Sequence, residues 1–209
     1  MEESSELKEA LCEVRKAYRL VAVYQRRILD MAKTIQKKFD YKSYWYINVQ
    51  YDIRGRSLPT DRRSMDLLPL YNGLSMLFLP QKAESNYPKR DEWMLEIRFD
   101  NDSGFEIRGS QEPNPKDFKD PRECESKIWL CAFGVMEDSK EIYWLDVFNN
   151  IEWPADDNYL TKNGKWAAGK YYNLSTIPDE KALITTIEDF NKFIDEKRKD
   201  LGFTEKIIG

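Results

Sequence analysis

The longest hydrophobic pattern in the chain covers residues 5 to 39 and predicts one continuous helix. Apolar or neutral residues recur there at alternating spacings of four and three, and no Gly or Pro interrupts them. This is a heptad seam with one polar interruption, Gln25. At 1.5 Å per residue the helix would be roughly 50 Å long, which leaves room for one end to project. The seam consists of Leu7, Leu11, Val14, Tyr18, Val21, Gln25, Ile28, Ala32, Ile35 and Phe39.

Two interpretations of this helix remain open from its pattern. In the first, it is a coiled-coil or docking helix that pairs with a protein partner or with itself. In the second, it is a core helix that crosses a sheet, with Val23, Tyr24 and Met31 widening its apolar face.

Period-two alternation and short apolar runs predict strands through the middle of the chain. In residues 44–51, Trp45 and Ile47 alternate with Tyr44 and Tyr46, so the two tyrosines are expected on the wetter face. Short turns or polar loops join the runs, and no helical crossover separates them, which favours an antiparallel sheet. The predicted strands cover residues 44–51, 70–80, 92–99, 105–109, 127–136 and 140–148.

A second helix is predicted near the C-terminus. Thr176 is its expected N-cap, Pro178 lies in the first turn, and Gly202 ends it. Before it, Asn163-Gly164 is a strong hairpin signal. The sequence therefore predicts one α+β domain over residues 1–209, with a long N-terminal helix, a mainly antiparallel sheet of about six or seven strands, and a C-terminal helix packed on the sheet. The predicted buried stripe of that helix is Leu183, Ile187, Phe190 and Ile194.

Composition removes several classes of chemistry. The chain has 209 residues, a net charge of -4 and no histidine, which excludes Ser-His-Asp and Cys-His catalysis and histidine-ligated zinc. Three cysteines without C-x-x-C spacing favour a reduced intracellular protein. We expect a cytoplasmic protein with no membrane span, because no apolar run approaches 18 residues and the N-terminus lacks a signal-peptide pattern.

A basic segment is the main candidate for nucleic-acid or phosphate binding. Residues 14 to 63 carry thirteen basic and four acidic side chains, a net charge of +9. Arginines suit phosphate groups, and exposed tyrosines stack on bases. The opposing interpretation is a solvated turn and helix face, neutralised by the acidic remainder of the fold. The candidate residues are Arg54, Arg56, Arg62, Arg63, Lys37, Lys38, Tyr44 and Tyr46.

Carboxylates offer a weaker lead. Glu96, Arg98, Glu106 and Arg108 are expected to share one solvated face of two neighbouring strands and to form ion pairs across them. An acidic strand also occurs in restriction-enzyme-like nucleases, but with lysine at the position of Arg98, and arginine cannot give up its proton. The loop acids Asp156 and Asp157 could join Asp146 or Glu152 around a hard cation, although the spacing of a calcium loop is missing.

From the sequence we therefore expect a non-enzymatic interaction or regulatory protein that docks a macromolecular partner through the long helix or an aromatic sheet surface. A nucleic-acid-binding protein that uses residues 14–63 is one alternative. A carboxylate- or metal-dependent, nuclease-like hydrolase is the other. We assign no catalytic residue, metal ligand or cofactor.

Overall fold

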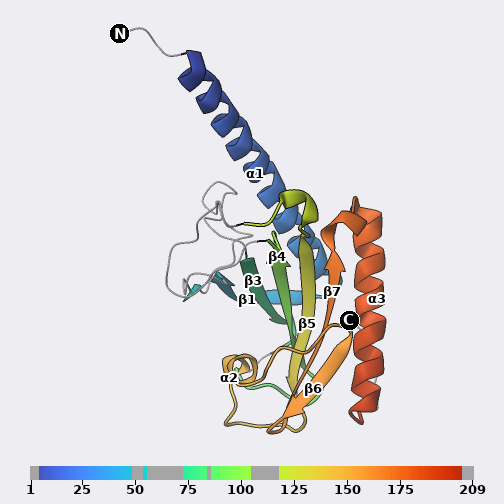
Figure 1. Cartoon of the computed structure of the whole chain (residues 1–209). Helices are drawn as coiled ribbons and strands as arrows, with labels where there is room; N and C mark the ends of the chain where they lie inside the picture. Colours follow the sequence, from blue (N-terminus) through green and yellow to red (C-terminus); the bar gives the residue numbers. More distant parts are fainter. Residues whose placement is uncertain (1–4, 49–53, 56–72, 84–85, 105–117, 204–209) are drawn as a thin grey trace.

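The computed structural model describes residues 5–48, 54–55, 73–83, 86–104 and 118–203. It has the predicted α+β fold, with a long N-terminal helix, an antiparallel sheet and a C-terminal helix (Figure 1). In chain order the elements are α1 (Ser5–Lys38), β1 (Tyr41–Asn48), β2 (Arg54–Gly55), β3 (Gly73–Pro80), β4 (Trp93–Asp100), η4 (Pro121–Glu123), β5 (Lys127–Val135), α2 (Trp144–Asn149), β6 (Asn158–Lys162), β7 (Lys165–Asn173), η5 (Leu174–Thr176) and α3 (Glu180–Asp200).

The strands form one sheet in the order β2-β1-β3-β4-β5-β7-β6, and every neighbouring pair is antiparallel. In the centre of the sheet, Leu130 of β5 is paired with Ile97 of β4 and Lys170 of β7. The β6–β7 hairpin turns at Asn163 and Gly164, whose φ angles are 53° and 72°. Two left-handed residues in succession are typical of a type I′ turn, so the predicted hairpin is confirmed.

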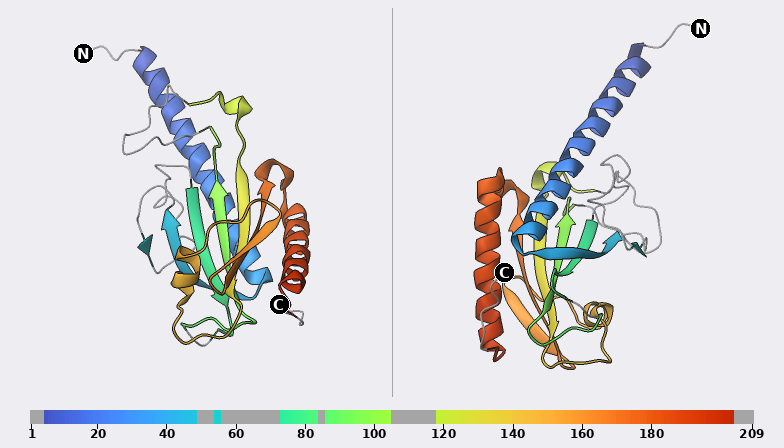
Figure 2. Two further views of the ribbon diagram at one scale, coloured as in Figure 1. Left: turned by 60° about the horizontal axis from the view of Figure 1, so that its bottom comes forward. Right: turned by 180° about the vertical axis from the view of Figure 1, so that it is seen from behind.

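Helices α1 and α3 cover one face of the sheet (Figure 2). Alternate residues of the central strands point into this layer, as the period of a strand requires. They pack with the apolar stripes of both helices into one core cluster. Among its members are Ala32 and Ile35 of α1, Leu95 and Ile97 of β4, Leu130 of β5, Trp166 of β7, and Ile187 and Phe190 of α3.

The opposite face of the sheet packs against α2 and the chain on either side of it. Leu77, Met94 and Phe133 of the sheet form a second core cluster there with Trp144 and Val147 of α2. The central strands are therefore covered on both faces, and seven of the nine residues of β5 are buried while the other two are half-buried.

The predicted strand over residues 140–148 is wrong, because helix α2 occupies most of this segment. Trp144 and Val147 are three residues apart, so a helix buries both on one face. The N–H of Tyr143 donates a hydrogen bond to the carboxylate of Asp146 at 3.0 Å, which stabilises the first turn. The predicted strand over 105–109 lies outside the described residues.

The start predicted for the C-terminal helix is also wrong, and the correct start lies a few residues later. The N-cap of α3 is Asp179, whose carboxylate accepts a hydrogen bond from the N–H of Ala182 at 2.9 Å. Thr176 belongs to η5 instead, and its hydroxyl donates to the carbonyl of Asn173 at 2.7 Å. Gly202, with φ at 82°, follows the helix end as predicted. The predicted buried stripe is confirmed at Leu183, Ile187, Phe190 and Ile194.

Candidate functional site

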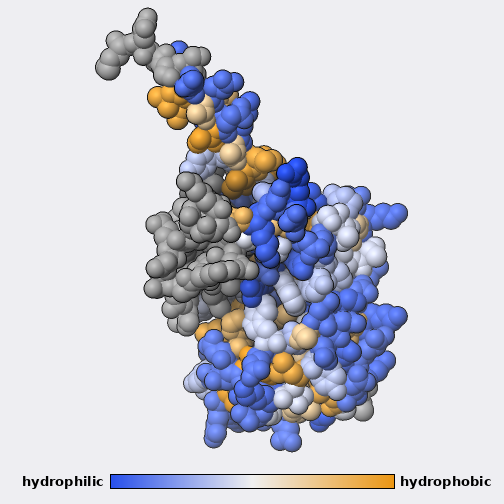
Figure 3. Space-filling view, viewed as in Figure 1, coloured by the Kyte–Doolittle hydropathy of each residue, from blue (hydrophilic) through white to orange (hydrophobic). Residues whose placement is uncertain are grey.

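The projecting half of α1 leaves the first part of the heptad seam in solvent. Leu7, Leu11, Val14 and Tyr18 are 60%, 46%, 48% and 59% exposed. We call these four residues the exposed seam. Figure 3 shows hydrophobic side chains gathered along this part of the helix. A row of apolar side chains at heptad spacing is the surface through which helices pair, and exposed apolar surface of this kind marks interaction sites.

The same seam becomes core farther along the helix. Ile28, Ala32 and Ile35 are 5%, 0% and 0% exposed and pack in the cluster between the helices and the sheet. The exposed and buried parts of the seam lie along one face of one helix. The sheet with the helices packed on it, which we call the body, covers the seam from Ile28 onward. Figures 1 and 2 show the first part of α1 projecting from this body. A helix bound along the exposed seam therefore has to end where the body begins.

Polar contacts hold α1 at the point where it leaves the body. The hydroxyl of Tyr24 donates to the side-chain carbonyl of Asn101 at 3.0 Å, and the guanidinium of Arg27 donates to the carbonyl of Ile177 at 2.5 Å. Burial raises the pKa of Tyr24, so its hydroxyl keeps the proton that it donates. These contacts tie α1 to the end of β4 and to the segment before α3, and they fix the direction of the projecting half.

The two edges of the exposed seam differ in charge. Helical geometry places Lys8 and Arg15 along one edge, at e positions, and Ala10 and Ala17 along the other, at g positions. All four are exposed. Arg19 lies farther out on the basic side, and Glu6 and Glu13 lie farther out on the alanine side. The stretch from residue 14 to 27 has five basic side chains and no acidic one, and these are Arg15, Lys16, Arg19, Arg26 and Arg27.

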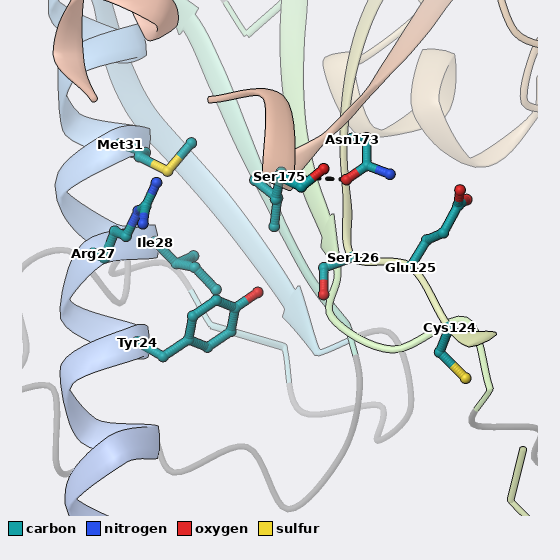
Figure 4. A pocket seen from close by; sticks show the side chains of 10 residues that line it. Tyr24, Arg27, Ile28, Met31, Cys124, Glu125, Ser126, Asn173 and Ser175 are labelled. Atoms are coloured by element: carbon teal, nitrogen blue, oxygen red, sulfur yellow. Dashed lines mark hydrogen bonds between the residues drawn. The ribbon is translucent and has the colours of Figure 1, made fainter. Parts of the chain in front are cut away.

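A cavity of about 380 Å³ opens at the base of the projecting half, between α1 and the ends of β5 and β7 (Figure 4). Ile28 and Met31 give it an apolar side. Its polar groups already have partners: Asn173 accepts from the N–H of Ser175 at 2.9 Å, and Ser126 donates to a backbone carbonyl at 2.6 Å. None of the described residues that line the cavity belongs to the exposed seam, so the cavity is a separate feature at the base of the projecting half.

The predicted nucleic-acid site falls only partly within the described residues. Arg54 lies in β2, where the backbone of its residue pairs with Ile47 of β1, so this arginine belongs to the strand next to the aromatic one. Lys37 and Lys38 are exposed in the last turn of α1. The prediction that these residues bind phosphate stays a prediction. Outside the described residues lie Arg56, Arg62 and Arg63.

The two tyrosines of this predicted site do not share a wetter face, so that part of the prediction is wrong. A bulge in β1 shifts the register between Ser43 and Trp45, and Tyr44 is the extra residue. Tyr46 is 8% exposed and belongs to the core under α1 and α3. Tyr44 is half-buried on the other face, where it lines a cavity of about 570 Å³ with Tyr143. Of the two, Tyr44 keeps surface on which a base could stack.

Glu96 was expected on a solvated face and is fully buried instead. β4 lies in the middle of the sheet with both faces covered, so the carboxyl of Glu96 is enclosed like the apolar side chains around it. The hydroxyl of Ser75 donates to Glu96 Oε1 at 2.5 Å, and Oε2 has no hydrogen-bond partner among the described residues. Burial raises the pKa of Glu96 to about 8, so the carboxyl is mostly neutral at pH 7. Arg98 pairs with Asp100 at 2.8 Å, a different partner from the predicted cross-strand acids.

A buried carboxyl with a raised pKa can be a proton donor in an active site. Glu96 lines neither the two cavities named above nor a third, of about 340 Å³, beside α1. Its contacts therefore connect it to the stability of the sheet. The sequence contained one sign of this burial. Met94 lies two residues before Glu96 and therefore on the same face of the strand, and an apolar residue there indicates that this face is covered.

The loop acids do not converge on one point. Asp157 pairs with Lys170 at 3.7 Å, and Glu152 pairs with Lys162 at 3.0 Å. Asp146 holds the first turn of α2, as described above. Across the described ranges, no three Asp, Glu or Cys side chains are placed as a metal site would require. Nor does any helix in that part of the chain combine the length and the apolar character that crossing a bilayer needs.

Comparison with known proteins gives a family and no activity. The family model described as PM0109 matches residues 4–200. A protein of Pasteurella multocida (strain Pm70), named "Uncharacterized protein PM0109", is 32% identical over 98 residues. That match spans 46% of this chain and 46% of the relative, so this chain aligns with less than half of the relative's length. No solved structure matches.

Proposed function

Since this chain belongs to the PM0109 family, whose description names no activity, we propose from its geometry that it is a non-enzymatic docking protein. The body carries the projecting half of α1 as a fixed arm. The exposed seam on that arm binds an amphipathic helix of a partner protein by side-to-side packing.

The observation that carries this proposal is the abrupt change of exposure along one seam. The four side chains of the exposed seam are 46% to 60% exposed. Farther along the same heptad pattern, Ile28, Ala32 and Ile35 are at most 5% exposed. Burying a Leu or Val side chain stabilises a complex by about 1.5–3 kcal/mol. An apolar row this exposed is unusual in a protein that works alone, and it is the kind of surface that marks an interaction site.

The test uses a synthetic peptide of three heptads with Leu at every a and d position and Glu at every e and g position. The flanking glutamates repel one another, which keeps the peptide from pairing with itself. Binding to the full chain is measured by isothermal titration calorimetry. We expect the double variant Leu11→Glu, Val14→Glu to weaken binding by about a hundredfold, which corresponds to about 2.7 kcal/mol.

The chain offers a matched control on the other side of the same helix. Leu20 and Val23 are 70% and 69% exposed, and helical geometry places them away from the exposed seam. The double variant Leu20→Glu, Val23→Glu makes the same two chemical changes and is expected to bind the peptide as the wild type does. Equal losses in both double variants, or no binding by the wild type, would refute the proposal.

A further inference from the structure

We infer that the exposed seam receives the acid-flanked helix of a different protein and not a second copy of this chain. This inference rests on the proposed function and names the chemistry of the partner. It follows from two properties of the surface, the position of the body and the charge of the seam edges.

A second copy in parallel orientation has no room. In a parallel pair, both helices would continue side by side past Tyr18 toward their buried halves. The buried half of each α1 packs its seam side against its own sheet, with Ile28, Ala32 and Ile35 in the core. Beyond the exposed seam, the partner helix would have to pass through the space that this sheet fills.

A second copy in antiparallel orientation avoids the body but opposes like charges. In antiparallel pairs, e positions of one helix face e positions of the other. Lys8 of one copy would therefore lie near Arg15 of the second, on the side where Arg19 adds another positive charge. The other edge, with Ala10 and Ala17 and with Glu6 and Glu13 farther out, would face itself, so these acids would lie near each other and away from Lys8 and Arg15.

An acid-flanked helix of another protein satisfies both constraints. A separate helix can end where the body begins, so it fits in either direction. Acidic residues on its flanks would face Lys8 and Arg15, and Arg19, farther out on the same side, adds to the attraction. Ala10 and Ala17 leave space on the other edge for larger side chains of the partner.

The experiment compares two peptides of three heptads on the full chain. Both have Leu at a and d positions, and one has Glu and the other Lys at all e and g positions. We expect the Glu peptide to bind about tenfold more tightly or better at low salt, with the difference shrinking as salt is added. The double variant Lys8→Glu, Arg15→Glu is expected to reverse the preference.

A matched control makes the same charge change away from the seam edges. Lys16 and Lys37 are exposed and lie on the outer face of α1. The double variant Lys16→Glu, Lys37→Glu is expected to keep a clear preference for the Glu peptide. The oligomeric state is measured in parallel by light scattering after size exclusion, where we expect the chain mass of 24.9 kDa.

The outcomes separate this inference from the proposed function. Equal binding of both peptides, lost in Leu11→Glu, Val14→Glu, would overturn the acidic partner and leave the docking function standing. A dimer that the same seam variant dissociates would also leave docking standing and make the second copy the occupant. Duplex DNA or anionic vesicles that bind through Lys8 and Arg15, and remain bound by the seam variant, would overturn both.

Discussion

The two halves of α1 repeat one hydrophobic pattern in opposite surroundings. From Leu7 to Tyr18 the seam faces solvent, and from Gln25 to Phe39 it is buried. The helix has 34 residues and is therefore about 51 Å long, while the central strands have eight or nine residues and span about 30 Å. The length of the sheet therefore sets how much of the seam becomes core, and the remaining part of the seam stays exposed.

The body contains the opposite anomaly. The arm keeps apolar side chains in water, whereas β4 keeps the carboxyl of Glu96 out of water. A row of apolar side chains exposed to water and a carboxyl that is costly to bury are both local departures from the usual distribution of residues. The following measurements test each side of this contrast.

The largest loss of stability is expected from a charge in the buried half of the seam, and it is compared with the same charge in the exposed half. Ile35→Asp puts a carboxylate into a site that is 0% exposed, and we expect the free energy of unfolding to fall by more than about 4 kcal/mol. Leu11→Asp makes a comparable change on the arm, and we expect a loss within about 0.5 kcal/mol. Urea denaturation followed by circular dichroism measures both.

A milder change in the core separates burial from charge. Ile35→Val removes one methylene and is expected to cost about 0.5–1.5 kcal/mol. If Leu11→Asp proved as damaging as Ile35→Asp, the arm would be part of the core in solution and the contrast between the halves would fail.

The second effect concerns Glu96 and the dependence of stability on pH. Its pKa is about 8 in the folded protein and near 4.5 in the unfolded chain. Between these pH values Glu96 binds a proton more often in the folded state than in the unfolded chain. The stabilisation that depends on its proton is therefore greatest below about pH 4.5 and is lost as the pH rises toward 8. Each pH unit costs up to about 1.4 kcal/mol, which amounts to a few kcal/mol over the whole window. Glu96→Gln mimics the neutral acid and is expected to flatten this decline.

Melting temperatures of the wild type and Glu96→Gln between pH 5 and pH 9 test this prediction. Glu188→Gln, an exposed position on α3, is the matched control and is expected to keep the pH dependence of the wild type. Parallel curves for wild type and Glu96→Gln would mean that Glu96 ionises without cost, and that its carboxyl reaches water.

The sequence predicted the parts of this fold that depend on local periodicity. The heptad spacing of α1, the central strand at residues 127–135 and the Asn163-Gly164 turn each follow from neighbours within a few residues. Residues 140–148 were predicted wrongly because Ile142 and Trp144 also fit a strand, and the choice depended on a capping contact by Asp146.

The features of the candidate site were less accessible, because they depend on tertiary cover. The pattern left open whether the helix crosses a sheet or docks a partner. The first interpretation holds for the buried half of α1, and the second stays a proposal for the exposed seam. The burial of Tyr46 followed from a bulge that period-two alternation cannot register. The burial of Glu96 followed from the layer over the second face of the sheet. For the predicted arginine site, Arg54 pairs its backbone with β1, and Arg56, Arg62 and Arg63 lie outside the described residues.

The smallest effect should come from weakening the helix itself, without charge and on the arm. Ala17→Gly lowers local helix stability by about 1 kcal/mol. We expect backbone amides of the arm to exchange with solvent about fivefold faster, as that free energy implies, while the free energy of global unfolding stays unchanged. Ala32→Gly makes the same substitution where the side chain is 0% exposed, and it should lower global stability instead. Hydrogen exchange followed by mass spectrometry resolves the two cases. A loss of global stability in Ala17→Gly would show that the arm folds with the body as one unit, and the seam would then be held in place by more than the buried half of α1.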